Sequence, residues 1–473
     1  MNFHRYFPAD RAPVETCIVG TGGFGRSFLA QGLRVPKMRA RVAVDREAEI
    51  AAASLKAVGV EPRRIRVCAS AAEAKAAFAA GDFIAAGDLA TVIDLPVEVV
   101  VEATGHPEAG ARHARLAIEA DRHLALVSKE VDSVIGPGLA RLAAARGRVV
   151  TPVDGDQPSL LIGLVSWAEM LGLEIIAAGK SSEYDFVFDP ASGRLTSNGS
   201  TIDVPDFAAV WSLGERPVAE IVAARARIAA ALPQRAVPDL CEMLVVANAT
   251  GLTPDRPDFH APIARVPEVP DVLAERADGG LLAGTRRLDV FNALRRPDEA
   301  SFAGGVFVLV RCSDPASWQM LAEKGHPVSR SGATGMVYIP RHLLGIEAAT
   351  SVLEAALLGA SSGGLDPRPH LDLVARATAD LPAGRVLAMG GHHHTIEGTT
   401  AELVPGRRLT ADAPAPFYLA ANCRLARPVA RGQAIAFGDL DMPAGSELLA
   451  LRERQDALFF GAGVEAGSVR EPA

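Results

Sequence analysis

The stretch Glu15-Thr-Cys-Ile-Val-Gly20-Thr-Gly22-Gly-Phe-Gly25 decides the fold of the first part of the chain. A short apolar run ends in glycines spaced Gly-x-Gly-x-x-Gly, and a helical apolar pattern follows through Phe28, Leu29 and Leu33. A second apolar run, residues 40–45, comes next, so the order is strand, glycine turn, helix, strand. This order is typical of a parallel βαβ crossover.

The glycine spacing indicates a turn that binds a dinucleotide. Glycines allow the tight turn, the close approach of backbone to a pyrophosphate, and close packing of the helix on the strand. The helix N-terminus also favours the phosphate charge. We therefore assign the phosphate-binding turn to Gly20, Gly22, Gly23, Phe24 and Gly25.

Asp45 is the expected ribose-binding residue, because it follows Gly25 by 20 positions and ends the next strand. A carboxylate there accepts from a ribose 2′-hydroxyl and repels a 2′-phosphate, which favours NAD over NADP. The neighbouring Arg46 leaves NADP open. The alternative is an ordinary glycine turn in which Asp45 caps a helix.

Strand and helix patterns alternate up to about residue 150, which predicts an α/β fold with a mainly parallel sheet. The apolar run 97–102 is followed by Thr104 and Gly105. Ligands bind at the carboxyl ends of strands in such sheets. We expect these two small residues to let the backbone approach the nicotinamide ribose, although a plain turn before a helix would use the same residues.

The pattern changes twice along the 473 residues, which predicts three domains. We expect a Rossmann dinucleotide-binding domain over 1–152 and an α+β catalytic and dimerisation domain over 153–362. An apolar helix over 342–358 would return to the first domain. A mainly-β domain would cover 363–473. The polar stretch 185–218 is expected to form a long surface excursion.

Composition excludes several classes of protein. Lys and Arg number 48 against 56 Asp and Glu, a net charge of −8, and aromatic residues make up 5%, so nucleic-acid binding is disfavoured. The five cysteines form no CxxC pair, which argues against disulfides and structural zinc. No apolar run is long enough for a membrane span or a signal core. We expect a cytoplasmic protein with a small-molecule substrate and neither a nucleic-acid nor a membrane partner.

Two lysines are the main catalytic candidates, because reduction of a ketone needs a proton donor and an acidic substrate needs a cation. Lys129 follows the apolar run 123–127 and is expected at the carboxyl edge of the sheet, facing the nicotinamide. Lys180 is expected at an exposed strand end, where it would donate a proton or hold a phosphate or carboxylate. The alternatives are a solvated loop lysine at 129 and an edge lysine paired with Glu183 or Asp185 at 180.

Three carboxylates are assigned supporting roles in the chemistry. Glu242 lies in an apolar stretch, where a carboxylate needs a partner, and we infer that Lys180 is that partner. Asp156 is a candidate N-cap for the helix from Pro158. Asp154 is harder to explain as a cap and is expected to contact substrate or a divalent cation.

Two other polar clusters receive structural interpretations. Glu130 and Asp132 are expected to cap a helix that starts at Pro137, and the alternative is that they orient Lys129. The run 392–394 consists of three histidines and is followed by Glu397, which resembles a metal site. Successive side chains of a strand point to opposite faces, so the run is interpreted as a surface loop or domain contact. No residue is assigned to a metal, and the need for a divalent metal stays open.

Residues 15–358 resemble the homoserine-dehydrogenase-like oxidoreductases, and the tail from about 370 resembles an SAF domain, a small β-clip module. Gly155-Asp-Gln-Pro-Ser159, Ala178-Gly-Lys180 and the stretch 242–251 carry the resemblance. The combination is similar to the predicted homoserine dehydrogenases with a C-terminal SAF domain. That group includes the 1-deoxy-D-xylulose 5-phosphate reductoisomerase-like enzymes of isoprenoid precursor synthesis.

The resemblance implies an NAD(P)-dependent oxidoreductase that acts on a ketone or aldehyde of a small polar, anionic substrate, with reduction coupled to isomerisation in the reductoisomerase-like members. It also implies a homodimer or higher homo-oligomer. The nearest match to the Asp-x-x-x-Lys pair of homoserine dehydrogenases is Asp239-Leu-Cys-Glu-Met243, with Met in place of Lys. Homoserine dehydrogenase and a dinucleotide-sensing binding protein are the alternatives.

Overall fold

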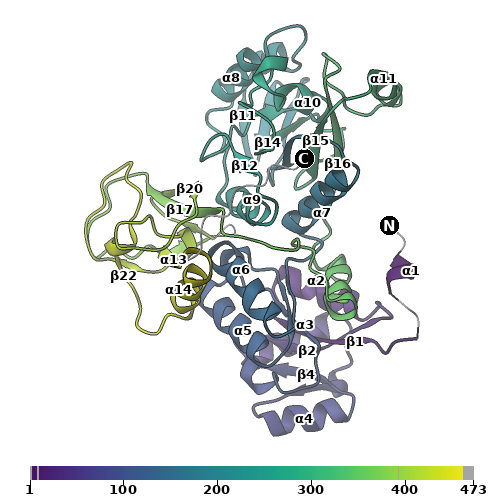
Figure 1. Cartoon of the computed structure of the whole chain (residues 1–473), viewed down its shortest axis with the longest axis vertical. Helices are drawn as coiled ribbons and strands as arrows, with labels where there is room; N and C mark the ends of the chain where they lie inside the picture. Colours follow the sequence, from purple (N-terminus) through teal and green to yellow (C-terminus); the bar gives the residue numbers. More distant parts are fainter. Residues whose placement is uncertain (1–2, 8–9, 392–393, 462–473) are drawn as a thin grey trace. The chain divides into compact units, whose positions relative to one another are not determined.

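The computed structural model describes residues 3–7, 10–391 and 394–461. Its internal contacts divide the chain into two compact units. The first unit comprises Met1–Thr151, Val352–Ser361 and Asp366–Ala473, and the second comprises Pro152–Ser351 and Ser362–Leu365. The C-terminal module, residues 366–461, therefore belongs to the same unit as the N-terminal sheet (Figure 1).

The first unit is built on a seven-stranded parallel sheet with the strand order β3-β4-β2-β1-β5-β6-β7. Its strands are β1 (Val14–Val19), β2 (Met38–Val44), β3 (Ile65–Val67), β4 (Phe83–Ala86), β5 (Val99–Glu102), β6 (His123–Leu126) and β7 (Val150–Thr151). Its main helices are α2 (Gly23–Gly32), α3 (Ala48–Ala57), α4 (Ala71–Ala79), α5 (Pro107–Glu119) and α6 (Lys129–Ala144). The predicted α/β fold with a parallel Rossmann-type sheet is confirmed.

The strand order reverses at β1, which pairs with β2 on one side and β5 on the other. Ligands of open parallel sheets bind at the carboxyl ends of the strands at such a switch point. The glycine turn follows β1, and Thr104 and Gly105 follow β5. The topology therefore brings these two predicted cofactor segments to the same edge of the sheet.

Helix α6 begins at Lys129, eight residues before the expected start at Pro137, which lies inside the helix. Glu130 and Asp132 occupy its first turn, where carboxylates interact favourably with the helix dipole. The expectation that these acids precede the helix is therefore wrong. The predicted start lies too far along the chain because it places Pro137 as the first residue, whereas this proline lies in the interior of the helix.

His123 opens β6 in its neutral form, because its Nδ1 accepts a hydrogen bond from the Val149 amide at 3.2 Å. Burial, with Arg148 and Arg11 adding to it, lowers the pKa of His123 to about 4. The unfolded chain, with an ordinary histidine pKa of about 6.5, binds this proton first. Stability should therefore fall as pH drops through the range from about 6.5 to 4.

We expect His123→Gln to make unfolding less dependent on pH in that range. Urea unfolding at pH 7 and pH 5 measures the effect, with exposed His326 changed to Gln as the matched control. An unchanged difference in unfolding free energy between the two pH values would contradict the prediction.

The second unit is built on a mixed sheet with the order β11-β10-β9-β14-β8-β15-β16, and β12 and β13 also pair with β14. Its strands are β8 (Ile175–Ser181), β9 (Phe186–Asp189), β10 (Arg194–Ser197), β11 (Ser200–Asp203), β12 (Thr253–Pro254), β13 (Ile263–Ala264), β14 (Arg287–Arg295), β15 (Val306–Arg311) and β16 (Thr334–Ile339). Its main helices are α7 (Gln157–Met170), α8 (Val218–Ile228), α9 (Val237–Thr250), α10 (Val269–Val272) and α11 (Pro315–Glu323).

The segment 185–218 is not the surface excursion that its polar composition suggested. It supplies strands β9, β10 and β11, and its apolar side chains Phe186, Phe188, Leu195 and Phe207 are buried in the core of the second unit. Alternate residues of a strand face one side, so a few large apolar residues between polar ones suffice to cover one face of a sheet.

The C-terminal module contains short antiparallel pairs, and its helix α14 (Glu447–Phe460) packs on helices α5 and α6. Its strands are β17 (Leu371–Ala377), β18 (Met389–Gly390), β19 (Thr395–Ile396), β20 (Thr399–Pro405), β21 (Arg424–Leu425) and β22 (Leu440–Asp441). The Arg115 guanidinium of α5 donates two hydrogen bonds to Glu447, at 2.9 and 2.8 Å. Gln455 of α14 accepts from the Gly138 amide of α6 at 2.8 Å.

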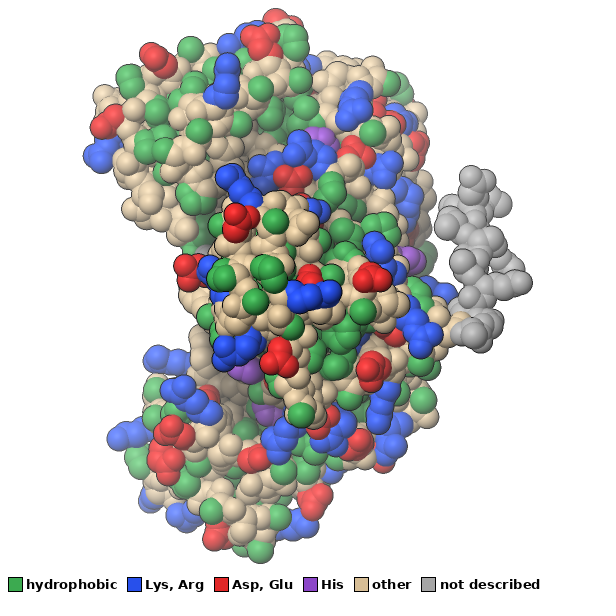
Figure 2. All heavy atoms as spheres, turned by 90° about the vertical axis from the view of Figure 1, so that its left-hand side faces the viewer, with side chains coloured by type: hydrophobic (Ala, Val, Ile, Leu, Met, Phe, Trp, Pro, Cys, Tyr) green, Lys and Arg blue, Asp and Glu red, His purple; other side chains and the backbone are tan. Residues whose placement is uncertain are grey.

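Within the described ranges, none of the helices has both the length and the apolar character that a bilayer crossing requires. On the face drawn in Figure 2, basic and acidic side chains are interspersed among apolar ones. The net charge of −8 is thus not gathered into one acidic area on that face.

Candidate functional site

The glycine turn after β1 has the shape of a phosphate cradle. Gly20 has φ +91°, and a Cβ there would lie 2.5 Å from the carbonyl oxygen of Ala103. A Cβ on Gly25 would overlap the Gly20 carbonyl, whereas around Gly22 and Gly23 the space is open. Two glycines therefore permit close packing of backbone, and the other two leave the N-terminus of α2 accessible to a ligand.

Asp45 lies beside the glycine turn and fixes its conformation. Its Oδ2 accepts from the Thr21 amide at 2.8 Å and from the Thr21 hydroxyl at 2.6 Å. Its Oδ1 accepts from the Arg46 amide at 2.8 Å. A carboxylate oxygen accepts more than one hydrogen bond, so a ribose hydroxyl can still be accommodated. These residues fit a dinucleotide.

The loop after β5 is held from inside the sheet by a residue that sequence reasoning missed. Glu102 is fully buried, and its Oε1 accepts from the Thr104 amide at 3.2 Å and hydroxyl at 2.5 Å. Ser128 accepts from the Gly105 amide at 2.8 Å. Lys129 follows Ser128 directly and is half-buried in the first turn of α6. An acidic residue at the end of a Val-rich strand was the available signal for Glu102.

Lys180 of β8 lies in a buried ion cluster of the second unit. Its side chain is 1% exposed, and its Nζ contacts the Glu242 carboxylate and Asp239 Oδ1, the latter at 2.9 Å. Ser182 donates to the other Asp239 oxygen at 2.7 Å. The pairing of Lys180 with Glu242 agrees with the expectation, whereas the expected exposed strand end is wrong. Asp239 is the member of the cluster that we did not assign.

The cluster has two carboxylates for one ammonium group, and burial and this excess of acidic groups shift the pKa of both Lys180 and Asp239. Burial lowers the pKa of Lys180, but Asp239 and Glu242 together raise it above its ordinary value. Burial also raises the pKa of Asp239, and Glu242 adds to the rise while Lys180 opposes it. Asp239 and Glu242 are three residues apart on α9, which puts them on one helix face. The cluster can therefore hold a proton beside strand β8 of the second unit.

Asp154 and Asp156 have structural partners in the second unit. Asp154 Oδ1 accepts from the Ser159 hydroxyl and Oδ2 from the Thr350 hydroxyl, both at 2.5 Å. Asp156 is the N-cap of α7 and accepts from the Gln157 amide at 3.0 Å. The N-cap role agrees with the simpler of the two interpretations of Asp156.

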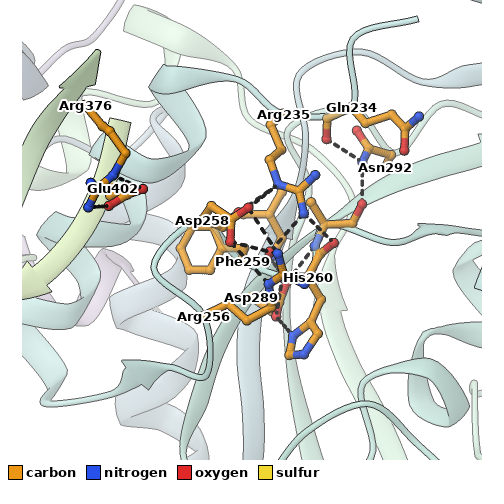
Figure 3. A network of polar contacts seen from close by, with 12 residues as sticks. Gln234, Arg235, Arg256, Asp258, Phe259, His260, Asp289, Asn292, Arg376 and Glu402 are labelled. Carbon is orange, nitrogen blue, oxygen red and sulfur yellow. Dashed lines mark hydrogen bonds and ion pairs between the residues drawn. The ribbon is translucent and has the colours of Figure 1, made fainter. Parts of the chain in front are cut away.

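A second titratable pair in this unit, His260 with Asp289, was not found from the sequence. Asp289 on β14 is fully buried and accepts from His260 Nδ1 at 2.7 Å and from the amides of His260 and Ala261, each at 3.1 Å (Figure 3). An aspartate within an otherwise apolar strand was the signal for a buried partner.

The loop that carries His260 adopts a strained backbone. Phe259 has φ +60° and Ala261 φ +47°, in the left-handed region that non-glycine residues rarely adopt. The Arg235 guanidinium holds the loop by donating to the carbonyls of Asp258, Phe259 and His260 at 3.1–3.3 Å (Figure 3). Such strain clusters at functional sites, which marks this loop as a candidate.

The structure divides the assigned residues between the two units. The glycine turn, Asp45, Thr104, Gly105 and Lys129 belong to the first unit, and Lys180, Glu242, Asp154 and Asp156 belong to the second. Among the residues that the structure describes, no group of three metal-ligating side chains gathers at one point. Of the histidine run, 392 and 393 lie outside the described residues.

A comparison with known protein families gives a match to part of the second unit. A family model described as "Oxidoreductase DRL, catalytic domain" matches residues 236–348, a range that contains Asp239, Glu242, His260 and Asp289. No curated protein gives a significant match. The second unit therefore carries a segment similar to an oxidoreductase catalytic domain.

Three solved structures match parts of the chain. GenD2 from gentamicin A biosynthesis in complex with NAD is 21% identical over 36% of this chain and 44% of that chain, with a TM-score of 0.25. A putative oxidoreductase from Klebsiella pneumoniae is 21% identical over 39% and 46%, with a TM-score of 0.24. A DOX-P reductoisomerase in complex with magnesium is 18% identical over 36% and 46%, with a TM-score of 0.27. The chain spans less than half the length of each.

Proposed function

We propose that the protein is an NAD(P)-dependent oxidoreductase acting on a small polar, anionic ketone or hydroxy compound. The observation that supports this most is the open glycine turn with Asp45 at the switch point of a parallel sheet. The same chain contains the stretch similar to an oxidoreductase catalytic domain. NAD remains the favoured cofactor because of the carboxylate at position 45.

The residues of the two units suggest a division of labour. Gly22 and Gly23, at the N-terminus of α2, would hold the pyrophosphate, and Asp45 the adenosine ribose. The bound nicotinamide would supply or accept the hydride at the substrate carbon. Reduction of a carbonyl also needs one proton at its oxygen, and the Lys180 cluster would provide it. His260, oriented by Asp289, is a second group able to transfer that proton.

Within this class we favour a reductoisomerase-like reaction on a phosphorylated keto sugar, as the resemblance implies. Homoserine oxidation is the second candidate, and one contact favours it. The 2.9 Å ion pair between Lys180 and Asp239 supplies an Asp–Lys pair although position 243 is Met. Turnover assays with 1-deoxy-D-xylulose 5-phosphate and with aspartate semialdehyde, each with NADH and NADPH, separate the two. Binding of dinucleotide with no turnover of either would favour the sensing protein. The homo-oligomer also remains a prediction, which light scattering can test.

Asp45→Asn should shift the cofactor preference from NAD(H) towards NADP(H) by about tenfold. The amide oxygen can still accept both hydrogen bonds from Thr21, whereas the contact with the Arg46 amide and the repulsion of a 2′-phosphate are lost. The ratio of the two dissociation constants, measured by nucleotide fluorescence, reports the change. Exposed Glu47 changed to Gln is the matched control. An unaltered ratio in the Asp45 variant would show that Asp45 does not read the ribose.

A further inference from the structure

His394 of the C-terminal module lies against Gly105, in the loop that follows β5 of the N-terminal sheet. It directly precedes β19, and its backbone has φ +48°. A Cβ on Gly105 would overlap His394 Cε1, so the imidazole occupies the space that any other residue at 105 would need. Both residues belong to the first unit. The C-terminal module thus reaches the carboxyl end of β5.

Glu130 fixes the orientation of this imidazole. His394 Nδ1 lies 2.6 Å from Glu130 Oε1, and Glu130 is 9% exposed in the first turn of α6. This hydrogen bond raises the pKa of His394, although burial and the neighbouring Lys129 oppose the rise. A histidine whose Nδ1 donates to a carboxylate presents its Nε2 in a fixed direction.

The remaining ring nitrogen is available to a ligand. The His394 side chain is 34% exposed, and no described residue forms a hydrogen bond with its Nε2. The Glu130 carboxylate is buried, and the imidazole packs closely on Gly105. A loop that only covers the surface would need neither contact. The backbone of Gly105 is itself held by Ser128, so the ring lies on a fixed platform.

We propose that His394 is a cofactor-binding residue supplied by the C-terminal module, with its Nε2 contacting the nicotinamide-ribose half of the dinucleotide. The proposal rests on the proposed function, because it takes the switch point at β1 and β5 as the dinucleotide site. At such a site the pyrophosphate lies at the N-terminus of the helix after the first strand. The loop after β5 is therefore on the side of the nicotinamide half. The C-terminal module would thus supply one residue of the dinucleotide-binding site.

His394→Asn and His394→Gln test this inference in the full-length chain. In the asparagine variant, the amide nitrogen can still donate to Glu130, but no atom takes the place of the histidine Nε2. The longer glutamine side chain places its amide group nearer the Nε2 position. The probes are NADH for the whole cofactor and AMP for its adenosine half. We expect His394→Asn to weaken NADH binding about tenfold, to leave AMP binding unchanged, and to be partly rescued by His394→Gln.

The control is His370→Asn, an exposed histidine on the same module, which should leave both affinities unchanged. Equal weakening of NADH and AMP, or unchanged NADH affinity in His394→Asn, would overturn the inference. Thermal denaturation of each variant verifies folding, and a loss of folding in His394→Asn that His394→Gln shares would assign His394 a structural role. If the wild type binds neither NADH, NADPH nor AMP, the proposed function itself is wrong.

Discussion

Lys180→Met is expected to lower the free energy of unfolding by about 3–5 kcal/mol, because it removes an ammonium group that contacts two buried carboxylates. Methionine fills a similar volume, so the cavity contribution is small. Asp239 and Glu242 are both nearly inaccessible to water and would have to take up protons or disrupt the packing of α9 on α7 and β14. The change should therefore cost far more than loss of an ordinary surface ion pair.

Urea unfolding of the full-length chain at pH 7 measures this effect. Exposed Lys324 changed to Met is the matched control and should change stability by no more than about 0.5 kcal/mol. The triple variant Lys180→Met, Asp239→Asn, Glu242→Gln removes all three charges and should recover most of the loss. A Lys180 variant as stable as the wild type would mean that the cluster is not the buried ion group described above.

The same variants separate stability from chemistry. If Lys180 transfers the proton or anchors the anionic substrate, the triple variant should be folded but reduced in turnover by at least about 100-fold. Turnover that survives in the folded triple variant would remove the Lys180 cluster from the reaction and leave His260 as the proton-transfer candidate.

Local features of the sequence predicted the strand, glycine turn and helix at the start of the chain well. The glycine spacing, the strand before it and Asp45 at its fixed distance all lie within 31 residues, 15–45, and each follows from backbone geometry. The pairing of Lys180 with Glu242 was predictable for a different reason. A carboxylate in an apolar helix needs a cation, whatever the details of the fold.

Contacts between distant segments could not be predicted in this way. His260 and Asp289 meet because β13 and β14 pair in one particular register, which the sequence does not reveal. His394 and Glu130 are separated by 264 positions and depend on how the C-terminal module packs. The burial of Lys180 depends on β14 and β15 flanking β8 on both sides. All three contacts join residues that are far apart in the sequence, and local hydrophobic periodicity carries no information about such contacts.

Gly25→Ala is expected to weaken dinucleotide binding by at least about 100-fold, because a single methyl group would overlap the carbonyl oxygen of Gly20. The methyl carbon is fixed by the backbone of residue 25, and the oxygen that it meets is itself a backbone atom, so no flexible side chain can relieve the clash. Gly20 has φ +91° and lies against Ala103. Its carbonyl therefore cannot move away from residue 25 unless the whole turn shifts. A displacement of the turn by about 1 Å would misalign the amides that hold the pyrophosphate, and misplacement on that scale can cost about 100-fold.

The overlap should also lower the free energy of unfolding by about 3 kcal/mol, the upper range for overpacking. Gly163→Ala in α7 is the matched control, because the space around that glycine is open and alanine favours a helix, so the variant should be slightly more stable than the wild type. Titration with NADH and with AMP distinguishes this prediction from that for His394, since Gly25→Ala should weaken both ligands. A Gly25 variant that binds NADH with wild-type affinity would show that the turn after β1 does not hold the pyrophosphate.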